Sequence, residues 1–198
     1  MSKGNILFHL TGSIACYKAC ILISRLVQHG FDVQTVLTQN ALHFIGASTL
    51  EGLTRRSPLS DTYERGRNMD HIHLSKWADL ALVCPATASS INRLAVGSGD
   101  DLLTALFLSY DLKSKPYWVA PAMNQQMYHH PATQSSLERL KSWGVRVLPT
   151  ETGHQACGDF GEGRLLNPDQ VFEHIVGAFS ETLNQRAIPM MKNEDREE

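Results

Sequence analysis

Residues 121–128, Pro-Ala-Met-Asn-Gln-Gln-Met-Tyr, carry the most informative chemistry of this chain. They follow the apolar run 117–120, Tyr-Trp-Val-Ala, which is typical of a buried strand. Asn124 and Met127 are three residues apart, so both would lie on one side of a short turn beyond that strand. Ligands bind at the carboxyl edge of open α/β sheets. The segment therefore predicts part of a binding site.

Two turns that contain small and hydroxyl side chains could bind a phosphate. Residues 12–14, Gly-Ser-Ile, precede a helical pattern, and the backbone N–H groups at a helix start form an anion site. The turn matches neither Gly-x-Gly-x-x-Gly nor a P-loop, so a single phosphate, as in a mononucleotide flavin, fits better than a dinucleotide or ATP. Residues 84–90, Cys-Pro-Ala-Thr-Ala-Ser-Ser, offer hydroxyls at a second helix start. Both segments also suit ordinary turns with a serine or threonine cap.

His71 is a candidate base, because imidazole exchanges protons near neutral pH. It lies in residues 69–74, Met-Asp-His-Ile-His-Leu, ahead of a short helix that we expect at 75–77. The His-x-His pattern could supply half of a metal site, but no further ligand follows at a useful spacing, so we expect no metal. A lone histidine is also common on surfaces and in structural roles.

Cys157 is a candidate for thiol chemistry. It lies in the glycine-rich segment 153–164, which is polar and has the composition of a mobile loop. A cysteine in such a loop is exposed to solvent, which is one condition for reactivity. A passive free thiol is the other interpretation of the same residues.

The composition describes one soluble globular domain. The chain has 198 residues, of which 42% are hydrophobic and 19% are charged. Its net charge of −2 gives no electrostatic reason to bind nucleic acid or a membrane surface. No signal peptide pattern is seen at the N-terminus. Cys16, Cys20, Cys84 and Cys157 form no Cys-x-x-Cys pair, so we expect free thiols in a reducing cytoplasm.

Strand and helix patterns alternate along the chain and must position these residues. The predicted strands are 5–10, 31–37, 78–84, 117–120 and 145–148. The predicted helices are 14–29, 87–96, 101–109, 133–143 and 168–183. This alternation predicts an α/β fold, a Rossmann-like or flavodoxin-like doubly wound, mainly parallel sheet in a single domain.

We expect this domain to span residues 1–185 and to be followed by a charged, disordered tail at 186–198. Two segments, 54–70 and 150–164, lack clear periodicity and are longer than ordinary connections. Segments of this kind are typical of functional loops, so we expect an active-site loop or flap in each.

Taken together, these motifs resemble the homo-oligomeric flavin-containing cysteine decarboxylases, over roughly residues 4–180. The resemblance is greatest to the bacterial phosphopantothenoylcysteine decarboxylase branch, which forms the N-terminal half of bifunctional coenzyme A biosynthesis proteins. The motif at 121–128 and Gln-Ala-Cys-Gly-Asp at 155–159 are highly specific, whereas Gly-Ser-Ile-Ala at 12–15 is not.

The resemblance implies a role for each matching residue. His71 corresponds to the proposed base, Asn124 to the residue that holds the substrate carboxylate, and Cys157 to a flap cysteine that donates a proton. Met127 and Ala156 are expected to contact the substrate. The positions that match the FMN site of the family are Gly12, Ser13, Ile14, Thr38, Thr87, Ala88, Ser89, Ser90 and Ala122.

The implied reaction is FMN-dependent decarboxylation of 4′-phosphopantothenoylcysteine to 4′-phosphopantetheine, a step of coenzyme A biosynthesis. Oxidation of the thiol gives a thioaldehyde, which is an electron sink, so CO2 can leave as an enethiolate forms. The hydride then returns while Cys157 supplies a proton. A carboxylate held by the neutral amide of Asn124 is less stabilised than one held by arginine, so its loss is less impeded.

One departure from the family and three alternatives remain open. The family motif Pro-Ala-Ser-Ala-Asn-Thr is Pro-Ala-Thr-Ala-Ser-Ser at 85–90, so Ser89 replaces an amide that would contact flavin. The alternatives are a peptidyl-cysteine decarboxylase, a flavin prenyltransferase on a related fold, and a non-catalytic subunit that regulates a phosphatase. The loop at 155–159 favours the small-molecule substrate, no dimethylallyl-phosphate motif is seen, and His71, Asn124 and Cys157 together favour an enzyme.

The resemblance also implies the assembly. The family forms trimers, or dodecamers built of trimers, with FMN between neighbouring subunits. We therefore expect a cytoplasmic homo-oligomer, either a trimer or a dodecamer. The chain ends soon after the last predicted helix, so we expect the phosphopantothenate–cysteine ligase of the preceding step to belong to a separate chain or to a removed segment.

Overall fold

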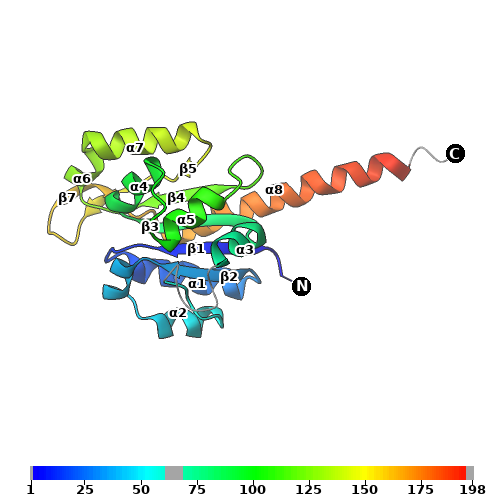
Figure 1. Ribbon diagram of the computed structural model, residues 1–198, viewed down its shortest axis with the longest axis horizontal. Coiled ribbons are helices and arrows are strands. Elements are labelled where there is room, and N and C mark those ends of the chain that lie inside the picture. The colour runs from blue at the N-terminus through cyan, green and yellow to red at the C-terminus, as the bar shows by residue number, and fades with distance from the viewer. Residues whose placement is uncertain (1, 61–68, 195–198) are drawn as a thin grey trace.

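The structure, a computed structural model, contains a five-stranded parallel sheet. It describes residues 2–60 and 69–194, and the side chains of the last helix only as far as Glu181. The strands are β1 (Asn5–Leu10), β2 (Asp32–Leu37), β3 (Leu80–Ala86), β4 (Tyr117–Pro121) and β5 (Arg146–Val147). Their spatial order is β2-β1-β3-β4-β5, and every neighbouring pair is parallel (Figure 1). This is the flavodoxin-like order, so the predicted fold is confirmed.

Helices cover both faces of the sheet. They are α1 (Cys16–Gln28), the 3₁₀ helix η1 (Gln39–His43), α2 (Ala47–Thr54), α3 (Asp70–Trp77), α4 (Ala88–Ala95), α5 (Leu102–Ser109), α6 (Gln125–His129), α7 (Pro131–Ser142) and α8 (Pro168–Glu194). Successive side chains of a strand point to opposite faces of the sheet, so β1 contributes residues to two hydrophobic clusters, one on each face. Ile6 and Phe8 pack with α1 and α8, whereas Leu7 packs with α4, α5 and α7.

Apart from α3 and α8, the predicted strands and helices are present with ends displaced by no more than two residues. The segment 54–70 is only partly described: α2 ends at Thr54, residues 61–68 lie outside the described part, and α3 already begins at Asp70. His71 therefore lies in the first turn of a helix and not ahead of one.

The segment 150–164, which we expected to be a functional loop or flap without regular structure, has regular secondary structure. The segment folds as an antiparallel hairpin of β6 (Glu151–His154) and β7 (Phe160–Arg164). Gly153, Gly161 and Gly163 occupy its buried positions. Because glycine has no side chain, the apolar and polar alternation that reveals a strand is missing from these residues. Figure 1 shows the hairpin and α6 together at one end of the sheet.

The last helix, α8, does not end near residue 183 but runs to Glu194. The charged, disordered tail that we expected at 186–198 stays a prediction. The end of α8 extends away from the rest of the protein, while its first turns pack on α1 (Figure 1). Residues 195–198 lie outside the described part, and a domain boundary at 185 stays a prediction. Across residues 2–60 and 69–194, no helix is long and apolar enough to cross a membrane.

A histidine is buried in the core. His9 on β1 is 0% exposed, and neither ring nitrogen has a hydrogen-bond partner among the described residues. Its ring centroid lies 6.2 Å from that of Tyr117, whose buried hydroxyl also has no partner within residues 2–60 and 69–194. Burial lowers the pKa of His9 from 6.5 to about 3, although Asp101 acts in the opposite direction. His9 is therefore neutral in the folded protein at pH 7.

This pKa makes the folding free energy depend on pH. As the pH falls below 6.5, the unfolded chain binds a proton at His9 and the folded protein does not, so stability is lost down to about pH 3. The contribution of one such group is at most about 1.4 kcal/mol per pH unit. We expect His9→Leu to remove this part of the slope of unfolding free energy against pH, measured by urea unfolding between pH 7 and 4.

The exposed histidine His73 provides a control, since His73→Gln should keep the wild-type slope. A His9→Leu protein with an unchanged slope would show that burial of His9 does not contribute to acid sensitivity.

Candidate functional site

A cleft of about 410 Å³ opens at the carboxyl edge of the sheet. The start of α1, the loop after β4 and the β6–β7 hairpin each form part of its wall. Six of the residues predicted from the sequence line it: Ser13, Ile14, Ala122, Asn124, Ala156 and Cys157. They come from three separate parts of the chain, and the parallel sheet brings them together where ligands of such folds bind.

Asn124 has two functions in this geometry. It is the N-cap of α6, and its Oδ1 accepts a hydrogen bond from the Met127 N–H at 2.9 Å. Because this bond fixes the amide oxygen on the helix, the Nδ2 group remains as a donor at the cleft. The loop thus offers an uncharged hydrogen-bond donor that suits a carboxylate.

The side chain of Met127 does not line the cleft. It lies on α6 and is 46% exposed, although the sequence placed it beside Asn124. The relation between the two residues is a different one, because the backbone N–H of Met127 binds the Asn124 side chain. The spacing of three residues that the motif shows is therefore the spacing of a helix cap.

The hairpin is held against the loop after β4 by backbone contacts. The Met123 N–H donates to the Gly163 carbonyl at 2.8 Å. The Gln155 side chain adds contacts to the same loop, since its Oε1 accepts from the Gln125 N–H at 3.2 Å and its Nε2 lies 3.5 Å from the Met123 carbonyl oxygen. Within the hairpin, Nε2 also donates to the Glu162 carbonyl at 2.7 Å. These contacts fix the hairpin beside the loop that carries Asn124, and residues of both line the cleft.

Cys157 lies in the turn of the hairpin. Among the four cysteines, all of which the structure describes, it is the one that is exposed. Its thiol lies 3.4 Å from Oδ2 of Asp159, a donor-to-carboxylate contact. Burial raises the pKa of Cys16 to about 11, and burial raises the pKa of Cys84 still further. Cys157 is therefore the thiol that is available for chemistry in the cleft.

The two predicted phosphate turns are joined by Thr11, a residue that the sequence analysis missed. Thr11 is 0% exposed, and its hydroxyl donates to the Pro85 carbonyl at 2.7 Å. The same oxygen accepts a hydrogen bond from the Thr87 N–H at 3.0 Å. A threonine directly before Gly-Ser at the end of a strand was the available signal, because a hydroxyl buried there must find partners.

Several backbone donors at these turns are free. Thr87 caps α4 by accepting from the Ser90 N–H, and the Ala122 N–H donates to the Ala86 carbonyl at 2.9 Å. The N–H groups of Ile14, Ala88 and Ser89 have no acceptor among the described residues. Free amides at a helix start, next to small side chains, suit a phosphate.

Thr38 lies apart from the cleft. It follows β2 and caps η1, where its side chain accepts from the Ala41 N–H. It lines a second, smaller cavity of about 120 Å³ together with Arg93 and Asp101. The chain alone therefore does not bring Thr38 to the wall formed by Asn124 and Cys157.

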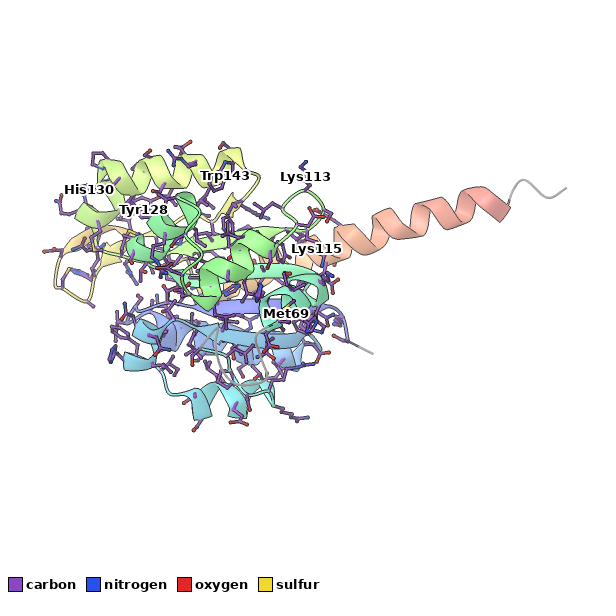
Figure 2. The ribbon with its side chains drawn as sticks, in the orientation of Figure 1. Met69, Lys113, Lys115, Tyr128, His130 and Trp143 are labelled. Atoms are coloured by element: carbon purple, nitrogen blue, oxygen red, sulfur yellow. The ribbon has the colours of Figure 1, made fainter. Side chains whose placement is uncertain are left out.

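His71 is also outside the cleft. Its side chain is half-buried, its Nδ1 has no partner among the described residues, and its carbonyl accepts from the Ser109 hydroxyl at 2.9 Å. In Figure 2, Met69, two residues before His71, lies well apart from Tyr128 of α6. The fold thus brings Asn124 and Cys157 together, but it does not bring His71 to them.

Comparison with known proteins supports a relationship over most of the chain. The family model described as Flavoprotein matches residues 1–180. The coenzyme A biosynthesis bifunctional protein CoaBC of Vibrio cholerae is 44% identical over 178 residues, which are 88% of this chain and 44% of that protein. The CoaBC protein of Escherichia coli K12 is 39% identical over 94% of this chain and 46% of its own length. The chain thus spans less than half the length of these relatives.

Solved structures match more completely. A cysteine-to-serine variant of a PPC decarboxylase, complexed with pantothenoylaminoethenethiol, is similar with a TM-score of 0.80 and 28% identity, over 89% of this chain and 98% of that one. The FMN-binding protein AtHal3 matches with a TM-score of 0.78 and 28% identity over 90% and 98% of the two chains. The peptidyl-cysteine decarboxylase EpiD matches with a TM-score of 0.73 and 26% identity over 89% and 99%.

The match to the family model includes all five strands of the sheet and every wall of the cleft. The sequence resemblance and the observed fold therefore lead to the same conclusion. The chain belongs to the Flavoprotein family.

Proposed function

We propose that this protein is an FMN-dependent decarboxylase that converts 4′-phosphopantothenoylcysteine to 4′-phosphopantetheine in coenzyme A biosynthesis. The observation that carries the proposal is the presence of the Asn124 amide and the exposed Cys157 thiol in one cleft. The relatives add support. The chain matches under half of a bifunctional coenzyme A protein but 98% of a PPC decarboxylase chain, so decarboxylation is the favoured activity of the matching half.

The cofactor of a Flavoprotein family member is a flavin, and we assign FMN. The free N–H groups of Ile14, Ala88 and Ser89 suit one phosphate, and the exposed Ile14 side chain offers an apolar surface beside them. The hydroxyl of Ser89, which replaces the amide of the family motif, adds a donor at this helix start. Bound FMN would accept a hydride from the substrate carbon that bears sulfur and would return it later.

The residues of the cleft would control the charge and the proton. The Nδ2 group of Asn124 donates to the substrate carboxylate and adds no positive charge, so the carboxylate can lose its charge as CO2 leaves. Cys157 lines the same cleft as Asn124 and would protonate the carbon of the enethiolate that remains. Cys157 lies in the turn of the β6–β7 hairpin. The hairpin would therefore act as the flap of the family and carry the proton donor to the substrate.

His71 would act on a neighbouring subunit. Within one copy it is outside the cleft, whereas the family resemblance implies a homo-oligomer, a trimer or dodecamer, with FMN between subunits. Ile14, Tyr17 and Ile21 form an exposed apolar stripe at helical spacing beside the cleft, with 58%, 58% and 49% of their surface accessible. Contact between such a stripe and a different surface of the next copy gives a closed ring, as in a trimer, when the rotation between copies closes.

If each active site is formed by two subunits, two inactive variants should complement each other in a mixed oligomer. We expect His71→Asn and Asn124→Asp each to keep bound flavin and lose turnover, because an aspartate in place of Asn124 would still cap α6 but could not donate to a carboxylate. Oligomers that contain both variants in equal amounts should regain roughly a quarter of the wild-type turnover, because random mixing restores that share of inter-subunit sites. The measurement is formation of 4′-phosphopantetheine by co-expressed proteins with two different affinity tags.

Co-expression of Asn124→Asp with Cys157→Ser is the matched control. Both residues line the same cleft of one copy, so this pair should not regain turnover. Failure of the first pair in verified mixed oligomers would place His71 outside the neighbour's site.

The decarboxylation itself is tested by mass spectrometry of 4′-phosphopantothenoylcysteine incubated with the purified yellow protein. We expect the wild-type protein to form 4′-phosphopantetheine. Cys157→Ser should still release CO2 but accumulate an oxidised aminoenethiol-type product, because serine is a poorer proton donor at this position. The compound bound to the cysteine-to-serine PPC decarboxylase variant belongs to this class.

An unchanged substrate with flavin bound would contradict the proposed substrate and favour a peptidyl cysteine. Ordinary product at the wild-type rate from Cys157→Ser would exclude Cys157 as the proton donor.

Thr11 should control cofactor affinity through the two turns that it joins. Thr11→Val keeps the shape of the side chain but removes both hydrogen bonds, so we expect FMN to bind about tenfold more weakly. Thr11→Ser keeps the hydroxyl and should bind FMN almost as well as the wild type. The measurement is the quenching of FMN fluorescence by apoprotein, with thermal unfolding of the apoprotein measured in parallel. Equal FMN affinity of Thr11→Val and the wild type would contradict this role.

A further inference from the structure

Two cationic side chains line the cleft, and neither forms an ion pair with a described residue. Lys18 of α1 and Arg164 at the end of β7 both line it, and His154 lies beside them. Among the described residues, no aspartate or glutamate contributes to its wall. The whole chain has a net charge of −2, so this concentration of cations is local. A cleft with this lining favours an anionic ligand.

The side chain of Arg164 is without a partner in the part of the chain that the structure describes. Its side chain is half-buried, and no described residue forms an ion pair or hydrogen bond with it. Other arginines of the chain behave differently: Arg25 pairs with Asp169, and Arg93 pairs with Asp100 and Asp101. A partly buried guanidinium without an acceptor is costly, and a bound anion would remove that cost.

The hairpin is shaped around this arginine. The guanidinium of Arg164 lies across Gly153 on the neighbouring strand, and a Cβ at that position would overlap its Nη1 atom. The absence of a side chain at residue 153 therefore leaves room for Arg164 along the wall of the cleft. Lys18 is half-buried on the facing helix and also lacks a partner among the described residues.

We propose that Arg164 and Lys18 form the subsite for the phosphate group of the substrate. This inference rests on the proposed function, in which Asn124 holds the carboxylate of the same molecule. The planar guanidinium binds phosphate through two parallel hydrogen bonds, and the ammonium of Lys18 adds a second positive charge. A cleft of about 410 Å³ is within the size range of small-molecule sites.

The subsite determines specificity. A substrate without the phosphate, or a peptide that ends in cysteine, would leave both cations unpaired, whereas 4′-phosphopantothenoylcysteine would neutralise them. The other phosphate near the cleft is that of FMN. It is assigned to the free amides of Ile14, Ala88 and Ser89, which belong to different segments from Arg164.

The test compares two ligands that cannot be decarboxylated, 4′-phosphopantothenate and pantothenate, on the FMN-loaded protein by calorimetry. We expect the wild type to prefer the phosphorylated ligand. Arg164→Gln should weaken binding of 4′-phosphopantothenate by about 10- to 100-fold and change that of pantothenate by less than about twofold. Lys18→Gln should have a smaller effect in the same direction, and Arg164→Lys should restore part of the affinity.

Arg139→Gln is the matched control, because Arg139 is an exposed arginine on α7 that does not line the cleft. It should leave both affinities unchanged. In turnover of 4′-phosphopantothenoylcysteine, Arg164→Gln should raise KM and leave kcat close to that of the wild type. Equal weakening of both ligands by Arg164→Gln would overturn the proposal, since it would indicate a packing defect.

Titration of the apoprotein with FMN, followed by fluorescence, tests whether Arg164 binds the phosphate of FMN and not that of the substrate. A loss of FMN affinity in Arg164→Gln, with ligand preference unchanged, would assign the guanidinium to the cofactor and overturn the proposal. The proposed phosphate subsite and the proposed reaction can be tested separately. A wild-type protein that prefers the phosphorylated ligand through Arg164 but leaves 4′-phosphopantothenoylcysteine intact would support the subsite and contradict the function.

Discussion

The close approach of the β6–β7 hairpin to the loop after β4 is the constraint on which the site depends. The Met123 N–H binds the Gly163 carbonyl at 2.8 Å, and a Cβ at residue 163 would lie 2.6 Å from the Met123 oxygen. Gly163 also has φ of +105°, a conformation that favours glycine. Asn124 follows Met123, and Arg164 follows Gly163. This single contact therefore places the amide, the guanidinium and the turn with Cys157 around one cleft.

Helix capping supplies the polar groups of this edge at little cost to folding. Asn124 and Thr87 each cap a helix that follows a strand of the sheet. A capping side chain satisfies one backbone N–H and leaves the others free, so the same turn that starts a helix also provides donors for a ligand. Thr11 connects the turn at Thr87 to the turn at residues 12–14 through its buried hydroxyl. Folding and ligand binding thus use the same hydrogen-bond groups.

The sequence predicted the sheet and most helices because buried strands and amphipathic helices have distinct periods. It also selected Asn124 and Cys157, which the fold then placed in one cleft. The hairpin was missed because glycines occupy its buried positions. Arg164 and Thr11 were missed because their importance depends on neighbours that are distant in sequence. The location of His71 could not be read from its motif, since it depends on the path of the chain into α3.

In the proposed arrangement, a neutral amide binds the carboxylate of the substrate and two cations bind its phosphate. The reaction explains why these two ends need groups of different charge. The carboxylate loses its charge when CO2 forms, so a cation there would stabilise the ground state more than the transition state and slow the step. The neutral amide of Asn124 avoids this penalty. The phosphate keeps its charge throughout, so Arg164 and Lys18 would bind substrate and transition state equally, which lowers KM without affecting kcat. Cations are therefore compatible with catalysis only at the end of the molecule where no charge is lost.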